Sequence, residues 1–307
     1  MTLKIYIEPT FTVPDRAEGG IRRVTEAIVK YLPQFGVESS DMRRADLTNG
    51  HGVMLPRKPG KPFISSCHGL YWEDYEWPSW AHEVNKLVTE ALCQAQVITA
   101  PSQWVAHALT RGLLRRPVVI PHGVDADEWA HDYEPTGYVL WNKARADPVS
   151  DPAPVGVIAR LMPDVKFVTT IGMAAENVTV TGVMPLPEIK PLVQRAGVYL
   201  ATARETFGIG TLEAMAAGVP VAGWDYGGQA EIIIEGETGY LADVGDYDGL
   251  AQCIKNCLRE KERLGRNAIA DVKTRWAWPD KIERYAALFQ KVHAQATEPR
   301  PVVGFEA

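Results

Sequence analysis

The sequence has little cysteine, no long apolar run and no excess of positive charge, and each of these shortages excludes a class of protein. Four cysteines in 307 residues are too few and too scattered for a disulfide framework. Cys253 and Cys257 lie one helical turn apart and are expected to pack in the core. No stretch approaches the roughly 20 apolar residues that a membrane-spanning helix needs. The net charge of −6 lacks the basic balance typical of a nucleic-acid-binding protein.

Targeting and metal-binding signals are also missing. The segment from Met1 to Pro9 is expected to be a strand and lacks the charged-then-apolar layout of a signal peptide, so we expect a cytoplasmic protein. His82 and Glu83 are not followed by a second histidine one turn later, because position 86 is lysine. We therefore expect neither a metal site nor a cofactor.

The hydrophobic pattern alternates between strands and helices, which favours an α/β fold with mostly parallel sheets. The expected strands are 3–8, 62–66, 97–100, 118–120, 138–141, 155–159, 165–170, 178–181, 198–201 and 219–222. The expected helices are 20–32, 81–95, 102–113, 187–195, 209–217, 229–234, 249–274 and 281–294. Ser102 is expected to cap the helix 102–113.

The polar stretch 123–137 has the composition of a linker and suggests that the alternation belongs to two units. We predict a first domain over 1–130, a second over 137–280, and a terminal helix and tail over 281–307. Two Rossmann-like domains place a cleft between them, and ligands of such sheets bind at the carboxyl ends of strands. Functional residues are therefore expected in the loops that follow strands.

One such loop carries an unusual pattern of charges and glycines. The segment from Ala203 to Val221 is A-R-E-T-F-G-I-G-T-L-E-A-M-A-A-G-V-P-V, in which Glu205 and Glu213 are separated by seven residues. Its glycines allow close approach of a ligand to the backbone, and the helix N-terminus that follows suits a phosphate. The carboxylates accept hydrogen bonds from the hydroxyl groups of sugars strongly.

This segment resembles that of the retaining glycosyltransferases of family 4, which include sucrose synthase and bacterial mannosyltransferases. The resemblance implies a GT-B fold, in which two Rossmann-like domains face each other across a central cleft and the last helix can return to the first domain. It implies that Glu205 holds the donor sugar and that Glu213 holds the nucleotide ribose. Phe207, Gly208 and Ile209 are then expected at the sugar and phosphates.

Other segments resemble the same family in the expected order. Gly19 and Gly20 correspond to a glycine loop that faces the donor diphosphate, although such a pair also begins ordinary helices. The segment from Val119 to Asp125 resembles the end of the family's first domain, with His122 where the family usually has asparagine.

The cationic and histidine positions depart from the family pattern or allow a second interpretation. The family places an arginine and then a lysine at the leaving diphosphate, and here Lys143 is expected to take the first role and Arg145 the second, at a different spacing. His68 lies where the family often has a histidine near the reacting sugar. We count His68 with Glu205 and Lys143 as a catalytic residue but not as general base, and a buried core histidine is the alternative.

Aromatic residues follow His68 and are weak candidates for the acceptor side. Tyr71, Trp72 and Trp77 could stack on a sugar or a base, or could simply pack together beneath a loop. A basic stretch nearby could attract an anionic acceptor or be a solvated loop. Its members are Arg43, Arg44, Arg57, Lys58 and Lys61.

The resemblance implies a retaining, metal-independent transfer of a hexose from a nucleotide-diphosphate-sugar to an acceptor hydroxyl, by front-face attack assisted by the donor phosphate. The acceptor stays open among a saccharide, a lipid-linked or small molecule, and modified DNA. Alternatives are transfer to hydroxymethylpyrimidine bases of DNA, a nucleotide-sugar epimerase that is not a transferase, and a non-catalytic sugar-binding module.

Overall fold

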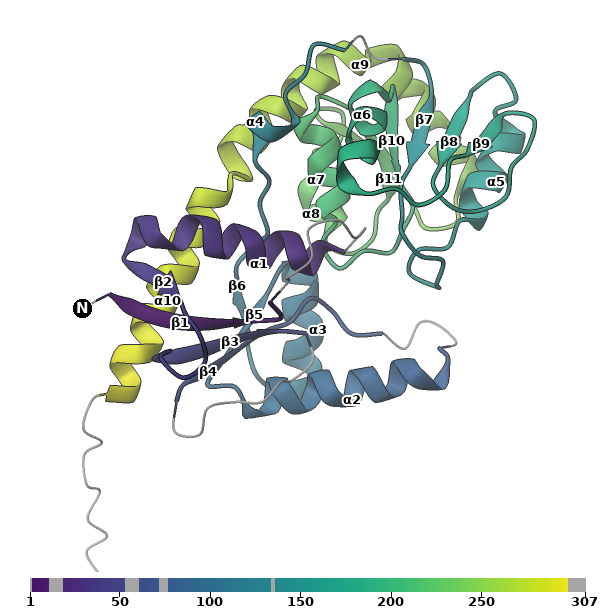
Figure 1. Ribbon diagram of the computed structural model, residues 1–307. Coiled ribbons are helices and arrows are strands. Elements are labelled where there is room, and N and C mark those ends of the chain that lie inside the picture. The colour runs from purple at the N-terminus through teal and green to yellow at the C-terminus, as the bar shows by residue number, and fades with distance from the viewer. Residues whose placement is uncertain (1, 11–18, 53–60, 72–76, 134–135, 298–307) are drawn as a thin grey trace, which may run out of the picture.

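The computed structural model describes residues 2–10, 19–52, 61–71, 77–133 and 136–297. Within them the chain forms two parallel six-stranded sheets, one above the other in Figure 1, with strand orders β2-β1-β3-β4-β5-β6 and β12-β11-β10-β7-β8-β9. The strands of the first sheet are β1 Leu3–Glu8, β2 Val37–Ser39, β3 Leu47–His51, β4 Phe63–Ser66, β5 Val97–Ala100 and β6 Val118–Val119. Those of the second are β7 Val139–Trp141, β8 Phe167–Thr169, β9 Val178–Val180, β10 Val198–Ala201, β11 Val221–Trp224 and β12 Gly239–Ala242.

Helices alternate with these strands, which confirms the predicted α/β class. They are α1 Gly20–Tyr31, α2 Ser79–Gln94, α3 Gln103–Leu113, α4 Ala126–Trp129, α5 Ala153–Leu161, α6 Leu186–Arg195, α7 Ile209–Ala216, α8 Gln229–Ile232, α9 Tyr247–Arg275 and α10 Trp278–Thr297, with a short 3₁₀ helix at Leu32–Phe35. Figure 1 shows α1 above the first sheet, beneath α7 and α8 of the other half, and α2 below that sheet. None of the helices in the described part of the chain has the length and apolarity that a membrane span requires.

Several local features follow from the sequence as predicted. α3 begins after Ser102, whose Oγ accepts a hydrogen bond from the backbone N–H of Val105 at 3.2 Å. Cys253 and Cys257 are buried and unpaired in the core of the second half. α10 packs against α1, so the last helix returns to the first half, as the GT-B architecture implies.

The strand predicted at 155–159 is wrong, because these residues lie in the helix α5. The buried positions Val155, Ile158 and Ala159 have helical spacing, but an apolar run this short does not distinguish a buried strand from a helix by periodicity. Three strands, β2, β3 and β12, were not predicted from the sequence. β3 has the sequence L-T-N-G-H and is buried along its whole length, so its polar composition conceals a central strand.

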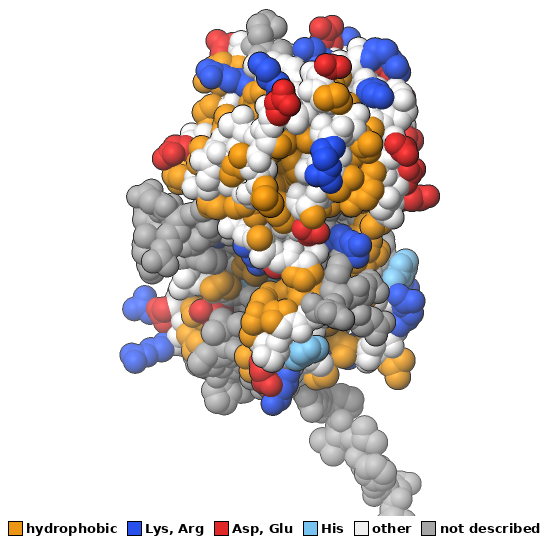
Figure 2. Space-filling model, turned by 90° about the vertical axis from the view of Figure 1, so that its right-hand side faces the viewer, with side chains coloured by type: hydrophobic (Ala, Val, Ile, Leu, Met, Phe, Trp, Pro, Cys, Tyr) orange, Lys and Arg blue, Asp and Glu red, His pale blue; other side chains and the backbone are white. Residues whose placement is uncertain are grey.

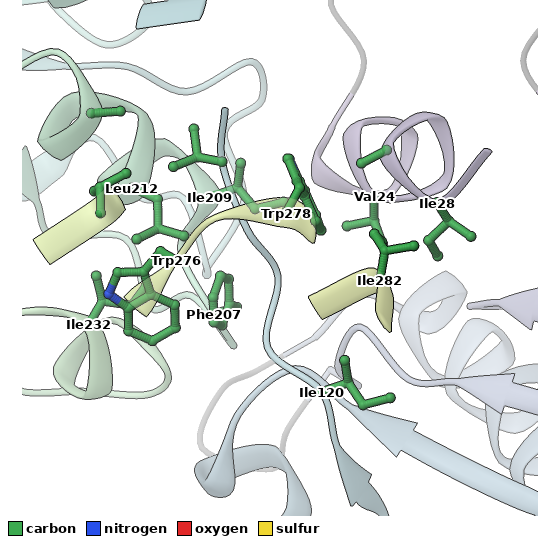
Figure 3. Packing of buried hydrophobic residues seen from close by; sticks show 14 of the residues in the cluster. Val24, Ile28, Ile120, Phe207, Ile209, Leu212, Ile232, Trp276, Trp278 and Ile282 are labelled. Atoms are coloured by element: carbon green, nitrogen blue, oxygen red, sulfur yellow. The ribbon is translucent and has the colours of Figure 1, made fainter. Parts of the chain in front are cut away.

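The chain crosses between the two halves twice, and the crossings lie side by side. The backbone N–H of Val124, in the first crossing, donates to the carbonyl oxygen of Trp276 in the second at 2.9 Å. Trp276 and Trp278 are both 6% exposed and belong to a core cluster that includes residues of α1 and α7. Figure 3 shows Trp278 between Ile209 of α7 and Val24 of α1, so the hydrophobic core is continuous from one half to the other.

Gly123 lies at this double crossing and leaves no room for a side chain. A Cβ atom there would be 2.9 Å from both the Trp276 carbonyl oxygen and the Trp278 Cδ2. We therefore expect Gly123→Ala to lower the free energy of unfolding by about 1–3 kcal/mol, because the backbone would have to move. Urea unfolding followed by tryptophan fluorescence measures this loss.

The matched control is Gly112→Ala in α3, where an added Cβ meets nothing within 4 Å. Alanine has the higher helix propensity, so this variant should gain up to about 1 kcal/mol. Equal stability of the two variants would contradict the assigned packing at the crossing.

Candidate active site

Two helix N-termini meet between the sheets. α1 begins at Gly20 and α7 at Ile209, and a Cβ atom at Gly20 would lie 3.1 Å from Ile209 Cδ1. The preceding residues, Gly19 and Gly208, provide no side-chain cap. Both helices therefore present first-turn N–H groups and partial positive charge at one place, which is an arrangement suited to an anion. Figure 2 shows the two lobes, with Lys or Arg side chains at the narrower waist between them.

Geometry requires glycine at two positions at the start of α7. Gly208 has φ +104°, in the region that favours glycine. A Cβ at Gly210 would lie 2.7 Å from the Tyr199 hydroxyl and 3.9 Å from Lys143 Nζ. Tyr199 thus forms the floor of the site beneath the start of α7, a role that sequence reasoning missed because this tyrosine lies inside an apolar strand.

Lys143 and Glu205 form an ion pair at the carboxyl ends of β7 and β10. Lys143 Nζ donates to Glu205 Oε1 at 2.8 Å, and the two side chains are 12% and 32% exposed. Lys143 is anchored through its backbone, whose N–H donates to Thr170 Oγ1 at 2.9 Å while the Thr170 hydroxyl donates to its carbonyl at 2.6 Å. The neighbouring ammonium group of Lys143 holds the pKa of Glu205 below its usual value, against the effect of burial. Glu205 is therefore an ionised hydrogen-bond acceptor at neutral pH.

Glu213 lies on the buried face of α7 and is paired across the two halves. Arg23 of α1 forms an ion pair with it, in which Arg23 Nε and Glu213 Oε1 are 2.9 Å apart, and the Glu213 side chain is 6% exposed. Burial raises the pKa of Glu213, and the Arg23 guanidinium opposes this effect. Arg23 was not among the residues predicted from the sequence. Its position in the first turn after the Gly19–Gly20 pair was the available signal.

Arg145, the predicted second cation, is placed differently from Lys143. It forms an ion pair with Asp147, in which Arg145 Nε and Asp147 Oδ2 are 2.6 Å apart, and its side chain is 64% exposed. Its charge contributes to lowering the pKa of Glu205, less than Lys143 does. Its role at a diphosphate stays a prediction.

His68 lies on a loop that contacts the Glu205 loop. The Thr206 hydroxyl donates to the His68 carbonyl oxygen at 2.5 Å, and Ser102 Oγ donates to the Thr206 carbonyl at 2.8 Å. The ring of Phe207 packs edge-on against His122, with centroids 4.9 Å apart. The structure therefore brings the histidine loop, the first crossing and the Glu205 loop together.

The candidate acceptor-side residues pack on one another. The ring centroid of Tyr71 lies 4.6 Å from that of Trp77 and 5.1 Å from that of Trp80. Trp72 lies outside the described residues. The rings thus contact one another, and a role of Tyr71 and Trp77 on the acceptor side stays a prediction.

The basic stretch lies away from the converging helix N-termini. Arg43 and Arg44 precede β3, and Lys61 precedes β4, so these three lie toward the amino ends of the strands. Arg44 is also paired with Asp41. Arg57 and Lys58 lie outside the described residues. Over the described ranges, no three His, Cys, Asp or Glu side chains gather as a metal site requires.

The Lys143–Glu205 pair predicts a pH-dependent effect of Lys143→Met. A carboxyl whose folded-state pKa is depressed contributes stability above its ordinary value of 4.5, and that contribution is lost as the pH falls through the folded-state pKa. Removing the ammonium leaves a partly buried carboxylate without its partner, so we expect a loss of about 1–3 kcal/mol near neutral pH. Because the variant's carboxyl protonates more readily, the difference from wild type should narrow as the pH falls from about 7 to about 4.

Urea unfolding across that pH range measures the difference. Lys255→Met, at an exposed position of α9, is the control and should track wild type at every pH. A Lys143→Met difference that stays constant with pH would argue against the ion pair.

The close approach at Gly210 predicts a rescue. Gly210→Ala should cost about 1–3 kcal/mol of stability, because its Cβ would overlap the Tyr199 hydroxyl. In the double variant with Tyr199→Phe, the overlapping oxygen is gone and most of the loss should be recovered. Gly156→Ala in α5, where the nearest atom is 3.8 Å away, serves as the control. Additive losses in the double variant would contradict the overlap.

Comparison with known proteins finds matches in both halves of the chain. Residues 173–271 match the family described as Glycosyl transferases group 1, and residues 40–128 match the family described as Glycosyltransferase Family 4. The N-acetyl-alpha-D-glucosaminyl L-malate synthase of Bacillus anthracis is 35% identical over 98 residues, which cover 31% of this chain and 26% of that protein. The alpha-1,3/1,6-mannosyltransferase alg-2 of Neurospora crassa is 32% identical over 135 residues, which cover 41% and 29%. The matches thus span less than a third of these relatives.

Solved structures show the same fold along almost the whole chain. Sucrose-phosphate synthase from Thermosynechococcus elongatus aligns with a TM-score of 0.74 at 15% identity, covering 95% of this chain and all of that one. Anabaena HepE in complex with UDP and glucose aligns with a TM-score of 0.72 at 17% identity, covering 94% of this chain and all of that one. With two GT-B sheets and matching segments in both halves, the chain belongs to glycosyltransferase family 4, the glycosyl transferases of group 1.

Proposed function

We propose that this protein is a retaining glycosyltransferase that moves a hexose from a nucleotide-diphosphate-sugar to an acceptor hydroxyl without a metal ion. One observation carries the proposal: the Lys143–Glu205 pair lies beside the uncapped N-terminus of α7, where that of α1 also arrives. An anion-binding site, a cation-paired carboxylate and a second buried carboxylate are the elements that a sugar diphosphate and its ribose require.

Each part of the donor has a matching group in this site. The diphosphate would bind the first N–H groups of α7 and the ammonium of Lys143. Glu205, held ionised, would accept hydrogen bonds from sugar hydroxyls, and Glu213 would accept those of the ribose diol. Because Arg23 forms an ion pair with Glu213, ribose binding would share or replace that contact.

The proposed transfer step follows from the negative charge that develops on the leaving diphosphate oxygen. The bond between the anomeric carbon and the diphosphate oxygen breaks, and the leaving oxygen becomes negative while Lys143 and the α7 amides stabilise it. The acceptor oxygen forms the new bond on the same face, and its proton passes to the departing phosphate oxygen. We assign neither glutamate as a nucleophile, so the pair is not a glycosidase-type carboxylate pair.

The identity of the donor can be narrowed by the comparisons. The HepE structures contain UDP, glucose or UDP-glucose, and a relative from Mycolicibacterium smegmatis is named as GDP-mannose-dependent. We propose UDP- or GDP-hexose as the first donors to test. Modified DNA is a weaker acceptor candidate, since the described basic residues lie toward the amino ends of the strands. A cytoplasmic location stays a prediction.

A donor panel tests the proposal. UDP-, GDP- and ADP-sugars are offered to wild type, Glu205→Ala and Lys143→Met, and release of nucleoside diphosphate is followed with and without saccharide acceptors. We expect slow hydrolysis of one donor by wild type and a loss of about 100-fold or more in both variants. Glu262→Ala, an exposed carboxylate on α9, should match wild type.

Two outcomes would contradict the proposal. Binding and turnover of none of the donors would rule out a nucleotide-sugar transferase. Conversion of the donor to its epimer without release of nucleoside diphosphate would instead support an epimerase. The anomeric configuration of the product, read by NMR, decides whether transfer retains it.

A further inference from the structure

Three histidines from separate segments of the first half form a row in which each ring contacts the next. His51 Nδ1 and His68 Nε2 are 2.8 Å apart and share a hydrogen bond. The ring of His68 in turn stacks on that of His122, with centroids 5.1 Å apart and planes 25° apart. His51 ends β3, His68 follows β4 and His122 lies in the first crossing. The row therefore leads from the buried sheet to the loop that contacts Thr206, the neighbour of Glu205.

Asn49 fixes the direction of hydrogen bonding at the buried end of this row. Its Nδ2 donates to the Ile64 carbonyl oxygen at 3.2 Å and to Ser66 Oγ at 2.9 Å. The opposite orientation of the amide would place Oδ1 against the Ile64 carbonyl, which can only accept. Asn49 Oδ1 therefore faces His51 Nε2, at 2.8 Å, and the hydrogen of that bond belongs to His51.

The direction of this hydrogen bond also fixes the direction of the bond between His51 and His68. Burial lowers the pKa of His51 well below its usual value and that of His68 to about 4, so both rings are neutral at pH 7. A neutral imidazole has one N–H, and His51 uses it toward Asn49. His51 Nδ1 is therefore an acceptor, and the hydrogen of the next bond is on His68 Nε2. Nδ1 of His68 then carries a lone pair.

We propose that Asn49 and His51 are positioning residues that fix His68 as its Nε2–H tautomer, so that His68 Nδ1 accepts a hydrogen bond from a substrate hydroxyl. Within the described residues, the one hydrogen bond of the His68 ring is made through Nε2, and one ring face is covered by His122. The His68 carbonyl is bound by Thr206, the neighbour of Glu205.

The inference rests on the proposed function for the identity of the hydroxyl. It specifies the substrate chemistry that His68 recognises: a hydroxyl donor is accepted, whereas a deoxy analogue or a carbonyl oxygen at that position leaves Nδ1 without a partner. It also excludes His68 as a cation for the diphosphate, since a neutral ring with its N–H committed to His51 offers no charge.

Two substitutions of His51 separate positioning from packing. Glutamine carries an acceptor oxygen and a donor nitrogen at a spacing close to that of the two ring nitrogens, so His51→Gln can preserve both bonds in the same direction. His51→Leu removes both. We expect His51→Gln to keep the Nε2–H tautomer of His68 and a kcat/KM near wild type. We expect His51→Leu to release the tautomer and to lower kcat/KM about tenfold.

The tautomer is read directly from long-range ¹H–¹⁵N correlation spectra of the full chain labelled with ¹⁵N-histidine, with His68→Gln identifying the signal. This readout needs no turnover, so it decides the inference even if no donor is found. His131→Leu is the control for loss of a histidine elsewhere, since His131 bonds the Ala217 carbonyl and the Tyr133 N–H. That variant should leave the His68 spectrum unchanged.

Two results would overturn the inference. One is an Nδ1–H tautomer of His68 in the wild-type spectrum. The other is a folded His51→Leu variant with the wild-type tautomer and kinetics, because Asn49 and His51 would then serve packing alone. A drop in kcat/KM for His51→Leu with no change of tautomer also counts against positioning through His51.

Discussion

The relative placement of the two sheets depends on the double crossing of the chain at Gly123 and Trp276–Trp278. A backbone hydrogen bond joins the two crossings, and the tryptophan rings continue the core from α1 to α7. Because core packing is close, each half has little freedom to shift against the other at this contact. The N-termini of α1 and α7 therefore face each other, and neither half could form the site alone.

Charge balance imposes a second constraint on the same site. A buried carboxylate without a partner is costly, and here each of the two glutamates has a cation. Glu205 is paired within the second half, whereas Glu213 is paired with Arg23 of the first. The Lys143 ammonium keeps Glu205 ionised, and the two ion pairs hold both side chains in place. In the row from Asn49 to His68, hydrogen bonds likewise hold the side chains in place.

Local sequence patterns predicted much of the fold, and their failures have physical reasons. Long amphipathic or capped segments such as α1 and α3 were identified because their periodicity and caps are local properties. The segment 155–159 was assigned to a strand because a short apolar run suits either element, and packing against α9 decides in favour of a helix. β3 was missed because a polar sequence is buried there by its neighbours, with Asn49 bonded to the next strand.

For the site, local sequence was enough to predict the Glu205–Glu213 segment and its glycines, because they belong to one strand–loop–helix unit, whereas Lys143 follows another strand and was predicted from the family resemblance. Only the tertiary structure decided the partners: Arg23 for Glu213, Tyr199 beneath Gly210, and His51 behind His68. These pairs join elements far apart in the chain, and no local periodicity encodes them. They exist because parallel strands bring their carboxyl ends to one edge and the crossing segments bring the two edges together.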